Sequence, residues 1–324
     1  MTLAAALPRY RWHGLGVLFL LLLVGPPFLS SFMLSLLTQA LIYSILAMSL
    51  DIILGYTGLA SLGHAAYFGL GAYGVGILAT RHGAGFWVTL GAGILLAVVV
   101  AAIFGLVALR ATGVYFLMIT LALGMVVWGL AHRWVSMTQG DNGISGVPRP
   151  RGLPWSLADA VPFYYFALAG FVLALWFLWT IVRSPFGQSL VGIRESESRM
   201  RTLGYHVWLH KYIGFVIAGG VGGFAGVLWA YYNGFVSPSD LELATSVEVL
   251  LMVALGGRGT LLGPALGAGL IVLLKNLVSV YTHRWLLILG AVYIGTIVYA
   301  PEGILGAVRQ WLKSVKPAPS GAGA

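Results

Sequence analysis

Six polar or ionisable residues lie in or beside long apolar runs, where such side chains are uncommon. Asp51 and His64 flank residues 55–63, a stretch rich in glycine and hydroxyl groups, and Glu248 lies in the short apolar run Thr245–Leu255. Ionisable groups at membrane depth are costly and often mark solute or ion pathways. Irregular backbone persists there only where protein or a water-lined cavity satisfies it. We therefore interpret as translocation-path candidates Asp51, Tyr56, Thr57, Ser61, His64 and Glu248.

A second interpretation of the same residues stays open. Residues 55–63 could equally form a loop at the cytoplasmic interface, with Asp51 capping a helix or extending its carboxylate to water. Glu248 could lie at the outer interface instead of in a pathway. The run Thr245–Leu255 is short enough for either a tilted span or a re-entrant segment.

Residue types needed for catalysis, metal binding or nucleotide binding are missing or wrongly placed. The chain has no cysteine, which excludes disulfides and thiolate metal sites, and no lysine follows a glycine, which excludes a phosphate-binding P-loop. Gly69, Gly71 and Gly74 form the dinucleotide-binding pattern G-x-G-x-x-G, but this motif lies inside an apolar run, and no acidic residue follows it until Asp141. His206 and His210 favour a solvated helix entry over a metal site. We predict no catalytic residue, no metal and no cofactor in this chain.

The composition is that of a membrane protein. Of 324 residues, 59% are hydrophobic and 8% charged, and the mean hydropathy is +0.93. So few charges cannot cover a soluble surface of this size, because such a surface needs roughly a quarter of its residues charged. The net charge of +9 comes from basic residues scattered between apolar runs. This pattern is typical of membrane loops and argues against nucleic-acid binding.

The apolar runs predict an all-α polytopic membrane protein with about ten transmembrane segments, or eight to ten, in one domain over residues 1–324. A span needs about 20 apolar residues; nine runs approach that length, and the shorter run Thr245–Leu255 is a tenth candidate. They are Leu15–Phe32, Leu34–Leu54, Ala65–Thr80, Phe86–Leu109, Val114–Ala131, Phe163–Val182, Tyr212–Tyr232, Thr245–Leu255, Leu261–Val280 and Trp285–Ala300. We interpret the first as an uncleaved span and not as a secretory signal, because no small-x-small cleavage site follows it.

Loop charges predict that both termini are cytoplasmic. With ten spans and the N-terminus inside, twelve basic residues fall inside, five fall outside, and Lys275 stays unassigned near a helix end. The cytoplasmic segments are then residues 1–14, 183–211 and 302–324, and residues 132–162 form a periplasmic loop. The turn near Ser237 and Ser239 is placed outside.

The inner loop carries the most informative local pattern. Ser184 and Pro185 suit a helix start, and Gly204 suits the position just after a helix end. Between them, Glu195 with Arg199 and Glu197 with Arg201 form i, i+4 pairs. The apolar stripe consists of Leu190, Ile193, Met200 and Leu203. A short amphipathic helix is expected, which either docks a cytoplasmic partner or rests on the membrane interface.

Glycines recur four residues apart within the apolar runs. Such pairs let membrane helices approach closely, because no Cβ separates the backbones. We therefore predict tight helix packing at Gly219 with Gly223, Gly222 with Gly226, and Gly263 with Gly267.

Four motifs occur in order and extend over most of the chain. They are GYTGLASLGHAAYFGLGAYG from Gly55, GDNGISGVP from Gly140, GQSLVGIRESESRMRTLGY from Gly187 and GGRGTLLGPALGA from Gly256. These motifs resemble those of the branched-chain amino acid permeases of bacterial ABC importers, of the LivM type.

This resemblance implies a transport subunit of the bacterial inner membrane that is not itself an enzyme. It implies a second permease of the LivH type, two ATPase subunits of the LivG and LivF type that bind ATP and Mg, and a periplasmic solute-binding protein. The segment Phe186–Leu203 would be the coupling helix that docks on the ATPase. Its docking residues would be Gly187, Gly192, Arg194, Glu195, Arg199 and Gly204.

The implied substrates are leucine, isoleucine and valine, with urea, short amides or other amino acids as alternatives. A different class of function also stays open, namely a secondary transporter driven by protons or sodium. Asp51, His64 or Glu248 would then act as the ion relay. A membrane enzyme is disfavoured, because no cluster of histidines or carboxylates is evident in the sequence.

Overall fold

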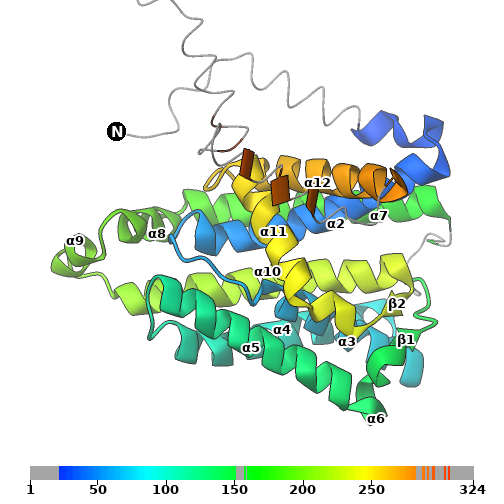
Figure 1. Cartoon of the computed structure of the whole chain (residues 1–324), viewed down its shortest axis with the longest axis horizontal. Helices are drawn as coiled ribbons and strands as arrows, with labels where there is room; N and C mark the ends of the chain where they lie inside the picture. The colour runs from blue at the N-terminus through cyan, green and yellow to red at the C-terminus, as the bar shows by residue number, and fades with distance from the viewer. Residues whose placement is uncertain are drawn as a thin grey trace, which may run out of the picture.

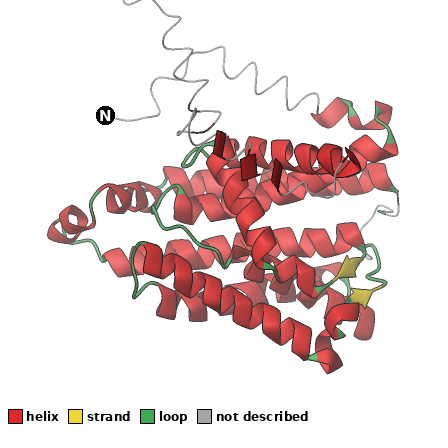
Figure 2. Cartoon of the chain, in the orientation of Figure 1, coloured by secondary structure: helices red, strands yellow, loops and turns green. Residues whose placement is uncertain are grey.

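A computed structural model describes residues 22–150, 157, 159–281 and scattered positions between 287 and 306, and these residues are almost entirely helical (Figures 1 and 2). The helices are α2 (Ser31–Leu54), α3 (His64–Arg81), α4 (Phe86–Ala108), α5 (Val114–Arg133), α6 (Val135–Thr138), α7 (Ala160–Arg183), α8 (Pro185–Glu195), α9 (Glu197–Thr202), α10 (Val207–Asn233), α11 (Leu243–Gly256) and α12 (Leu262–Tyr281). Short 3-10 turns are η1 (Pro26–Phe28), η2 (Gly140–Asn142) and η3 (Pro238–Leu241), and the strands are β1 (Ile144–Ser145) and β2 (Phe235–Val236).

Within the described part, six helices are long and apolar enough to cross a membrane, namely α2, α4, α5, α7, α10 and α12. Two other expected spans are present as shorter helices, the 18-residue α3 and the 14-residue α11. The expected span Leu15–Phe32 is described only from residue 22, where η1 interrupts it before α2 begins at Ser31, and Trp285–Ala300 is described only at scattered positions. The expectation of about ten spans therefore stays a prediction.

The long helices form two groups that meet at α2 and α10. Helices α7, α11 and α12 pack around α2, whereas α3 and α4 pack against α10 (Figure 1). In the most apolar window of each helix, 83% of α2 and 72% of α10 are buried, against 22–33% for the other long helices. The core of the molecule therefore lies along α2 and α10, and the peripheral helices expose apolar faces.

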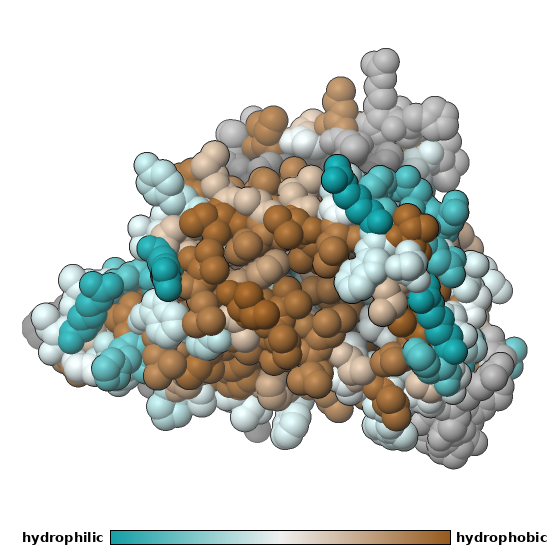
Figure 3. All heavy atoms as spheres, turned by 90° about the horizontal axis from the view of Figure 1, so that it is seen from below, coloured by the Kyte–Doolittle hydropathy of each residue, from teal (hydrophilic) through white to brown (hydrophobic). Residues whose placement is uncertain are grey.

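The two ends of this bundle differ in structure. Helices α8 and α9 project beyond one end, and β1, β2 and α6 lie at the other (Figure 1). We call these the α8 end and the β1 end. In the face shown in Figure 3, hydrophilic residues lie at both ends and an apolar band lies between them. This distribution fits a bilayer whose normal runs from one end to the other.

The expected break between two apolar runs is present. Helix α2 ends at Leu54, residues 55–63 are non-helical, and α3 begins at His64. At the β1 end, β1 pairs antiparallel with β2, so that Ile144 lies opposite Val236. This pairing attaches the loop before α7 to the segment between α10 and α11.

Several glycines lie where two helix backbones touch. A Cβ on Gly226 of α10 would overlap the carbonyl oxygen of Phe68 in α3, and a Cβ on Gly71 of α3 would overlap the carbonyl oxygen of Gly223 in α10. A Cβ on Gly219 of α10 would overlap the Cβ atom of Ala101 in α4. A Cβ on Gly267 of α12 would overlap the carbonyl oxygen of Met252 in α11, and one on Gly263 would lie 2.6 Å from that of Gly257.

Candidate functional site

Asp51 lies in the last turn of α2, and its carboxylate is fully buried. Its two oxygens accept hydrogen bonds from the backbone N–H of Gly259, at 2.8 Å, and of Leu261, at 3.2 Å. These donors belong to residues 257–261, which turn the chain from α11 into α12. Gly257 and Gly259 have positive φ of 112° and 75°, which glycine adopts without a Cβ clash. Asp51 therefore acts as a cap for this loop and attaches it to α2.

Arg194 of α8 reaches the same place from the other side. Its guanidinium donates a hydrogen bond to the carbonyl oxygen of Gly55, just after α2. Its aliphatic stem lies over Gly58, where a Cβ would be 3.0 Å from Cγ of Arg194. The structure thus brings together at the α8 end three segments far apart in sequence: residues 55–58, residue 194 and residues 257–261. We call this group the inner junction.

Two of the three hydroxyl groups in residues 55–63 form local hydrogen bonds. Thr57 Oγ1 donates to the carbonyl oxygen of Ile53 at 2.6 Å, and Ser61 Oγ accepts from the N–H of Gly63 at 3.3 Å. Tyr56 and Ser61 are both buried. Thr57 and Ser61 therefore shape the non-helical segment, and Tyr56 is buried within it.

His64 begins α3 and is fully buried. Its Nε2 lies 3.0 Å from Ser49 Oγ, which itself donates to the carbonyl oxygen of Leu46 at 2.7 Å. Since the serine proton is used there, this network assigns the imidazole proton to Nε2. His64 thereby connects α3 to α2, and Nδ1 has no hydrogen-bond partner within the described part of the chain.

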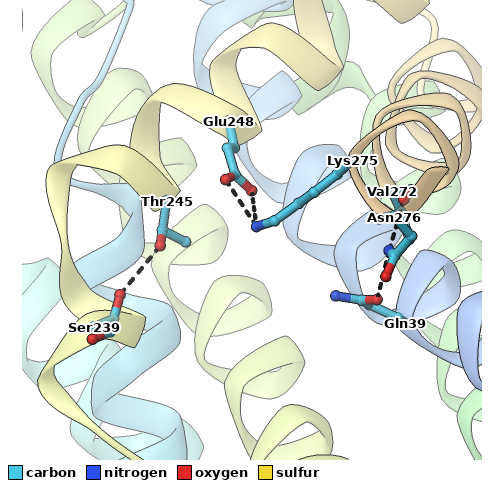
Figure 4. A network of polar contacts seen from close by, with 7 residues as sticks. All are labelled: Gln39, Ser239, Thr245, Glu248, Val272, Lys275 and Asn276. Atoms are coloured by element: carbon cyan, nitrogen blue, oxygen red, sulfur yellow. Dashed lines mark hydrogen bonds and ion pairs between the residues drawn. The ribbon is translucent and has the colours of Figure 1, made fainter. Parts of the chain in front are cut away.

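Glu248 of α11 pairs with Lys275 of α12, as Figure 4 shows. Lys275 Nζ lies 2.9 Å from Oε1 and 3.1 Å from Oε2 of Glu248. The Glu248 side chain is 6% exposed and that of Lys275 is 32% exposed. Lys275 was not predicted as a site residue, although a lysine within an apolar run is itself a signal of function.

The inner helix is divided in two, which corrects the expectation of one helix over Phe186–Leu203. Ser184 caps α8 by accepting from the N–H of Gly187 at 3.3 Å, and Gly204 has the positive φ of 88° that follows a helix end. Between them, Ser196 is extended and caps α9 by accepting from the N–H of Arg199. A serine can accept such a bond only from outside the helix that it caps, so the helix breaks there.

The break changes the expected ion pairs. Glu195 and Arg199 now belong to different helices, and no ion pair found among the described residues joins them. Glu197 lies 3.7 Å from Arg201, as predicted, and it also pairs with Lys211 at the start of α10. The second pair connects α9 to a long helix of the bundle.

Two predicted docking glycines face inward. A Cβ on Gly192 would lie 2.7 Å from the sulfur of Met200, and one on Gly187 would overlap the carbonyl oxygen of Val182 at the end of α7. Of the predicted apolar stripe, Leu190, Ile193 and Met200 are buried, whereas Leu203 is 66% exposed. Five exposed residues at the end of α8, in α9 and just after α9 form a group that we call the docking face, which consists of Glu195, Ser198, Arg199, Leu203 and Tyr205.

At the β1 end, Asp240 accepts hydrogen bonds from the N–H of Ser237, at 3.0 Å, and from Nε1 of Trp229, at 2.9 Å. Burial raises the pKa of the Asp240 carboxyl, and these two donors oppose that shift. Neither Asp240 nor Trp229 is among the site residues predicted from the sequence. Their interaction fixes η3 to α10.

The described residues include no group of three or more histidine and acidic side chains that could hold a metal ion. The polar side chains named above join helices to one another, and the docking face is exposed. This arrangement suits motion between elements and attachment of a partner.

Comparison with known proteins identifies relatives among transport proteins. Residues 32–297 match the family "Branched-chain amino acid transport system / permease component". The chain is 32% identical over 299 residues to the high-affinity branched-chain amino acid transport system permease protein LivM of Escherichia coli, covering 85% of this chain and 70% of that protein. No solved structure matches the chain significantly.

Two more distant relatives match shorter parts of the chain. A probable branched-chain amino acid transport permease protein LivM of Methanocaldococcus jannaschii is 26% identical over 140 residues, which is 39% of this chain and 41% of that protein. The autoinducer 2 import system permease protein LsrC of Salmonella typhi is 28% identical over 136 residues, which is 40% of this chain and 39% of that protein.

Proposed function

The chain belongs to the family of branched-chain amino acid transport system permease components, and from that premise we propose that it is the membrane-spanning permease subunit of an ATP-driven importer. It would form half of the translocation path for leucine, isoleucine and valine. Urea, short amides and other amino acids are alternative substrates within the same family. The chain itself is a multi-pass membrane protein.

The observation that carries this proposal is the docking face and its connection to the bundle. The face combines charged groups with two exposed apolar side chains, Leu203 at 66% and Tyr205 at 44%. Such a mixture is common where two proteins meet. Behind the face, Arg194 joins α8 to residues 55–58, and the pair of Glu197 with Lys211 joins α9 to α10. Movement of a docked partner would therefore reach α2, α10 and the loop before α12.

We propose partners that match the missing functions. The sequence has no P-loop, so ATP and Mg would be bound by two ATPase subunits of the LivG and LivF type on the docking face. A second permease of the LivH type would complete the path. A periplasmic solute-binding protein would deliver the substrate at the β1 end. The complex would lie in the bacterial inner membrane, with both termini in the cytoplasm.

The glycine contacts have a role in this proposal. They bring α10 against α3 and α4, and α12 against α11, at backbone distance. Close backbone contact resists bending better than contact through long side chains. We propose that each group of helices moves as one body when the ATPases move the docking face.

An ion-coupled secondary transporter is less well supported. Such a protein needs ionisable groups that can exchange an ion along a path. Here Asp51 is bonded to the backbone of residues 259 and 261, His64 to Ser49, and Glu248 to Lys275. Each candidate relay residue thus has a different partner on a different element. A proton relay would have to break all three interactions.

The test is reconstitution of the importer with and without its ATPases. Vesicles that contain this chain, the second permease, both ATPases and the binding protein should take up radiolabelled leucine only when ATP is present on the docking-face side. The purified chain alone should hydrolyse no ATP above background. Uptake driven by a proton or sodium gradient without the ATPases would refute the importer assignment.

A further inference from the structure

Glu248 and Lys275 bring two opposite charges together within the bundle. Lys275 is six residues before the end of α12 at Tyr281, which corresponds to about 9 Å along the helix. The pair is therefore set back from the β1 end, and its Lys275 lies within the apolar span Leu262–Ser279. Its Glu248 carboxylate is almost enclosed, whereas about a third of the Lys275 side chain is exposed. The pair can therefore be approached from the lysine side.

Stability does not explain why this pair is present. An enclosed ion pair loses hydration, and its replacement by apolar residues of similar volume is often neutral or stabilising. Helices α11 and α12 are also held by direct backbone contact, because Gly256 packs against Gly263 and Gly267 packs against Met252. The two helices thus have another means of attachment. An ion pair at membrane depth that packing does not require is a candidate for function.

The pair belongs to a larger group of polar residues, drawn in Figure 4. Beside Lys275, Asn276 Nδ2 lies 3.4 Å from the amide oxygen of Gln39 on α2. One turn before Glu248, Thr245 Oγ1 donates to the carbonyl oxygen of Ser239 in η3 at 3.4 Å. We call this group the polar strip, which consists of Ser239, Thr245, Glu248, Lys275, Asn276 and Gln39. It leads from η3 into the bundle.

The charges of the strip select a class of ligand. The charges of one carboxylate and one ammonium group add to zero, and the remaining groups of the strip are neutral amides and hydroxyls. A simple cation or anion would meet one attractive and one repulsive charge there. A neutral molecule with separated charges would meet two attractive ones, provided that its own charges have a similar separation.

An α-amino acid has this separation. Bonds of about 1.46 Å and 1.52 Å at an angle of about 111° place its ammonium nitrogen about 2.5 Å from its carboxyl carbon. Lys275 Nζ lies 2.9 Å from the nearer oxygen of Glu248. The charged groups of the amino acid can therefore lie side by side with the Glu248–Lys275 pair, each group facing a charge of opposite sign. The ammonium then donates to Glu248 and the carboxylate accepts from Lys275, while Glu248 and Lys275 stay in contact.

We propose that the Glu248–Lys275 pair binds the α-ammonium and α-carboxylate groups of the transported amino acid on its way through the protein. The proposal rests on the proposed import function and adds the contact site of the substrate. Gln39 and Asn276 supply further amide groups beside the two charges. Because the site recognises only the groups shared by all α-amino acids, it does not distinguish leucine from valine.

The test replaces both charges together, so that neither is left unpaired. The variant Glu248→Leu/Lys275→Met keeps apolar volume between α11 and α12. The matched control is Glu242→Leu, which removes an exposed carboxylate just before the same helix. Each chain is measured in the complete importer for copurification of its partners, basal ATP hydrolysis, and leucine uptake with saturating binding protein.

We expect the double variant to assemble and hydrolyse ATP as the wild type does, with leucine uptake reduced at least about tenfold, the effect of losing one charged hydrogen bond. The control should keep wild-type uptake. Wild-type uptake by the assembled double variant would overturn the proposal, because the pair would then be dispensable for transport.

A second variant covers the case in which the double variant does not assemble. Glu248→Lys/Lys275→Glu keeps the ion pair but reverses it, so a bound amino acid would have to enter in the opposite orientation. Assembly without leucine uptake supports the substrate site, and assembly with normal uptake overturns it. Failure of both variants to assemble would assign the pair to packing and also overturn the site.

The experiment separates this proposal from the import function on which it rests. The wild-type importer is measured in the same vesicles. If the wild type takes up no amino acid with ATP, the proposed function is wrong. If the wild type transports leucine and the double variant does so equally well, only the Glu248–Lys275 site is wrong.

Discussion

At the scale of single residues, the polar side chains of this protein act by joining elements. Asp51 attaches the loop before α12 to the end of α2, and Arg194 attaches α8 to the segment that follows α2. Both contacts use backbone groups as partners. A side chain that bonds to backbone moves with the whole loop and not with one neighbouring side chain. The inner junction can therefore transmit a displacement of α8 to the two other segments, residues 55–58 and residues 257–261.

Arg194 gives a direct test of this transmission. Arg194→Ala removes the bond to the Gly55 carbonyl, and a hydrogen bond from a charged donor contributes about 1.5–3 kcal/mol. We expect the variant importer to hydrolyse ATP and to retain its ATPases, but to move at least about tenfold less leucine per ATP. Arg194→Lys should restore part of the transport, because lysine keeps a charged donor. The measurement is the ratio of leucine uptake to ATP hydrolysis in vesicles.

Arg110→Ala is the matched control for Arg194, because it removes another exposed arginine just after α4. It should leave the ratio unchanged. If Arg194→Ala also left the ratio unchanged, the inner junction would have no part in coupling. If it released the ATPases instead, Arg194 would belong to the docking contact.

Local signals at single residues could be predicted, but long-range partners could not. The capping by Ser184, the proline at the start of α8 and the positive φ of Gly204 depend on neighbours within a few residues. The partners of Asp51 are more than two hundred positions away in the sequence. Capping was one of two alternatives for Asp51, and only packing of α12 against α2 brings the N–H donors to it.

At the scale of elements, α8 and α9 behave as one small unit. Met200 of α9 folds under Gly192 of α8, and Ile193, Met200 and Val207 form a buried cluster. The expected single helix failed to account for Ser196, whose side chain caps α9 and stops α8. Gly192 therefore serves the contact between α8 and α9. A large residue there would disrupt that unit, so it does not test the docking of a partner.

Leu203 is a better test of docking, because it is exposed and follows α9. We expect Leu203→Asp to keep normal abundance in the membrane, since exposed substitutions usually change stability by within about 0.5 kcal/mol. At a partner contact of at least about 2 kcal/mol, binding of the ATPases should weaken by roughly 30-fold or more. Copurification of the ATPases and leucine uptake measure the effect.

The conservative variant Leu203→Met keeps an apolar side chain at the same position, and it should bind the ATPases and transport leucine normally. Glu195→Arg reverses a charge on the same face and should weaken binding in the same assay. If Leu203→Asp bound the ATPases as well as the wild type does, α9 would be excluded from the contact. The unit would then rest on the membrane interface.

At the scale of the whole molecule, the fold surrounds two buried helices with helices that expose apolar surface. Helix lengths and the position of the break after α2 could be predicted from hydropathy, because a span needs a fixed length of apolar chain. Hydropathy could not predict that α3 and α11 lie in the interior of the bundle. Both are short and buried on most sides, so their sequences need not resemble a helix that faces lipid.

Whether α11 crosses the membrane depends on the side at which the loop after it lies. Fourteen residues extend about 21 Å, which is less than the roughly 30 Å of a bilayer core. However, η3 precedes α11 from the β1 end, and the loop after α11 is bonded to Asp51 at the α8 end. Together η3 and α11 should therefore carry the chain across.

Single cysteines can test this crossing, because the chain contains no cysteine of its own. The positions are Ser145 in β1, Ser198 in α9 and Arg258 in the loop after α11, all of which are exposed. In intact spheroplasts, a membrane-impermeant maleimide should label Ser145→Cys. Ser198→Cys and Arg258→Cys should react only after the membrane is permeabilised, because loop charges place the α8 end in the cytoplasm. Ser49→Cys, at a fully buried position, is the control and should react only after denaturation.

Labelling of Arg258→Cys together with Ser145→Cys would show that α11 does not cross. Labelling of Ser198→Cys from outside would reverse the orientation of the whole protein and place the docking face where no ATP is available.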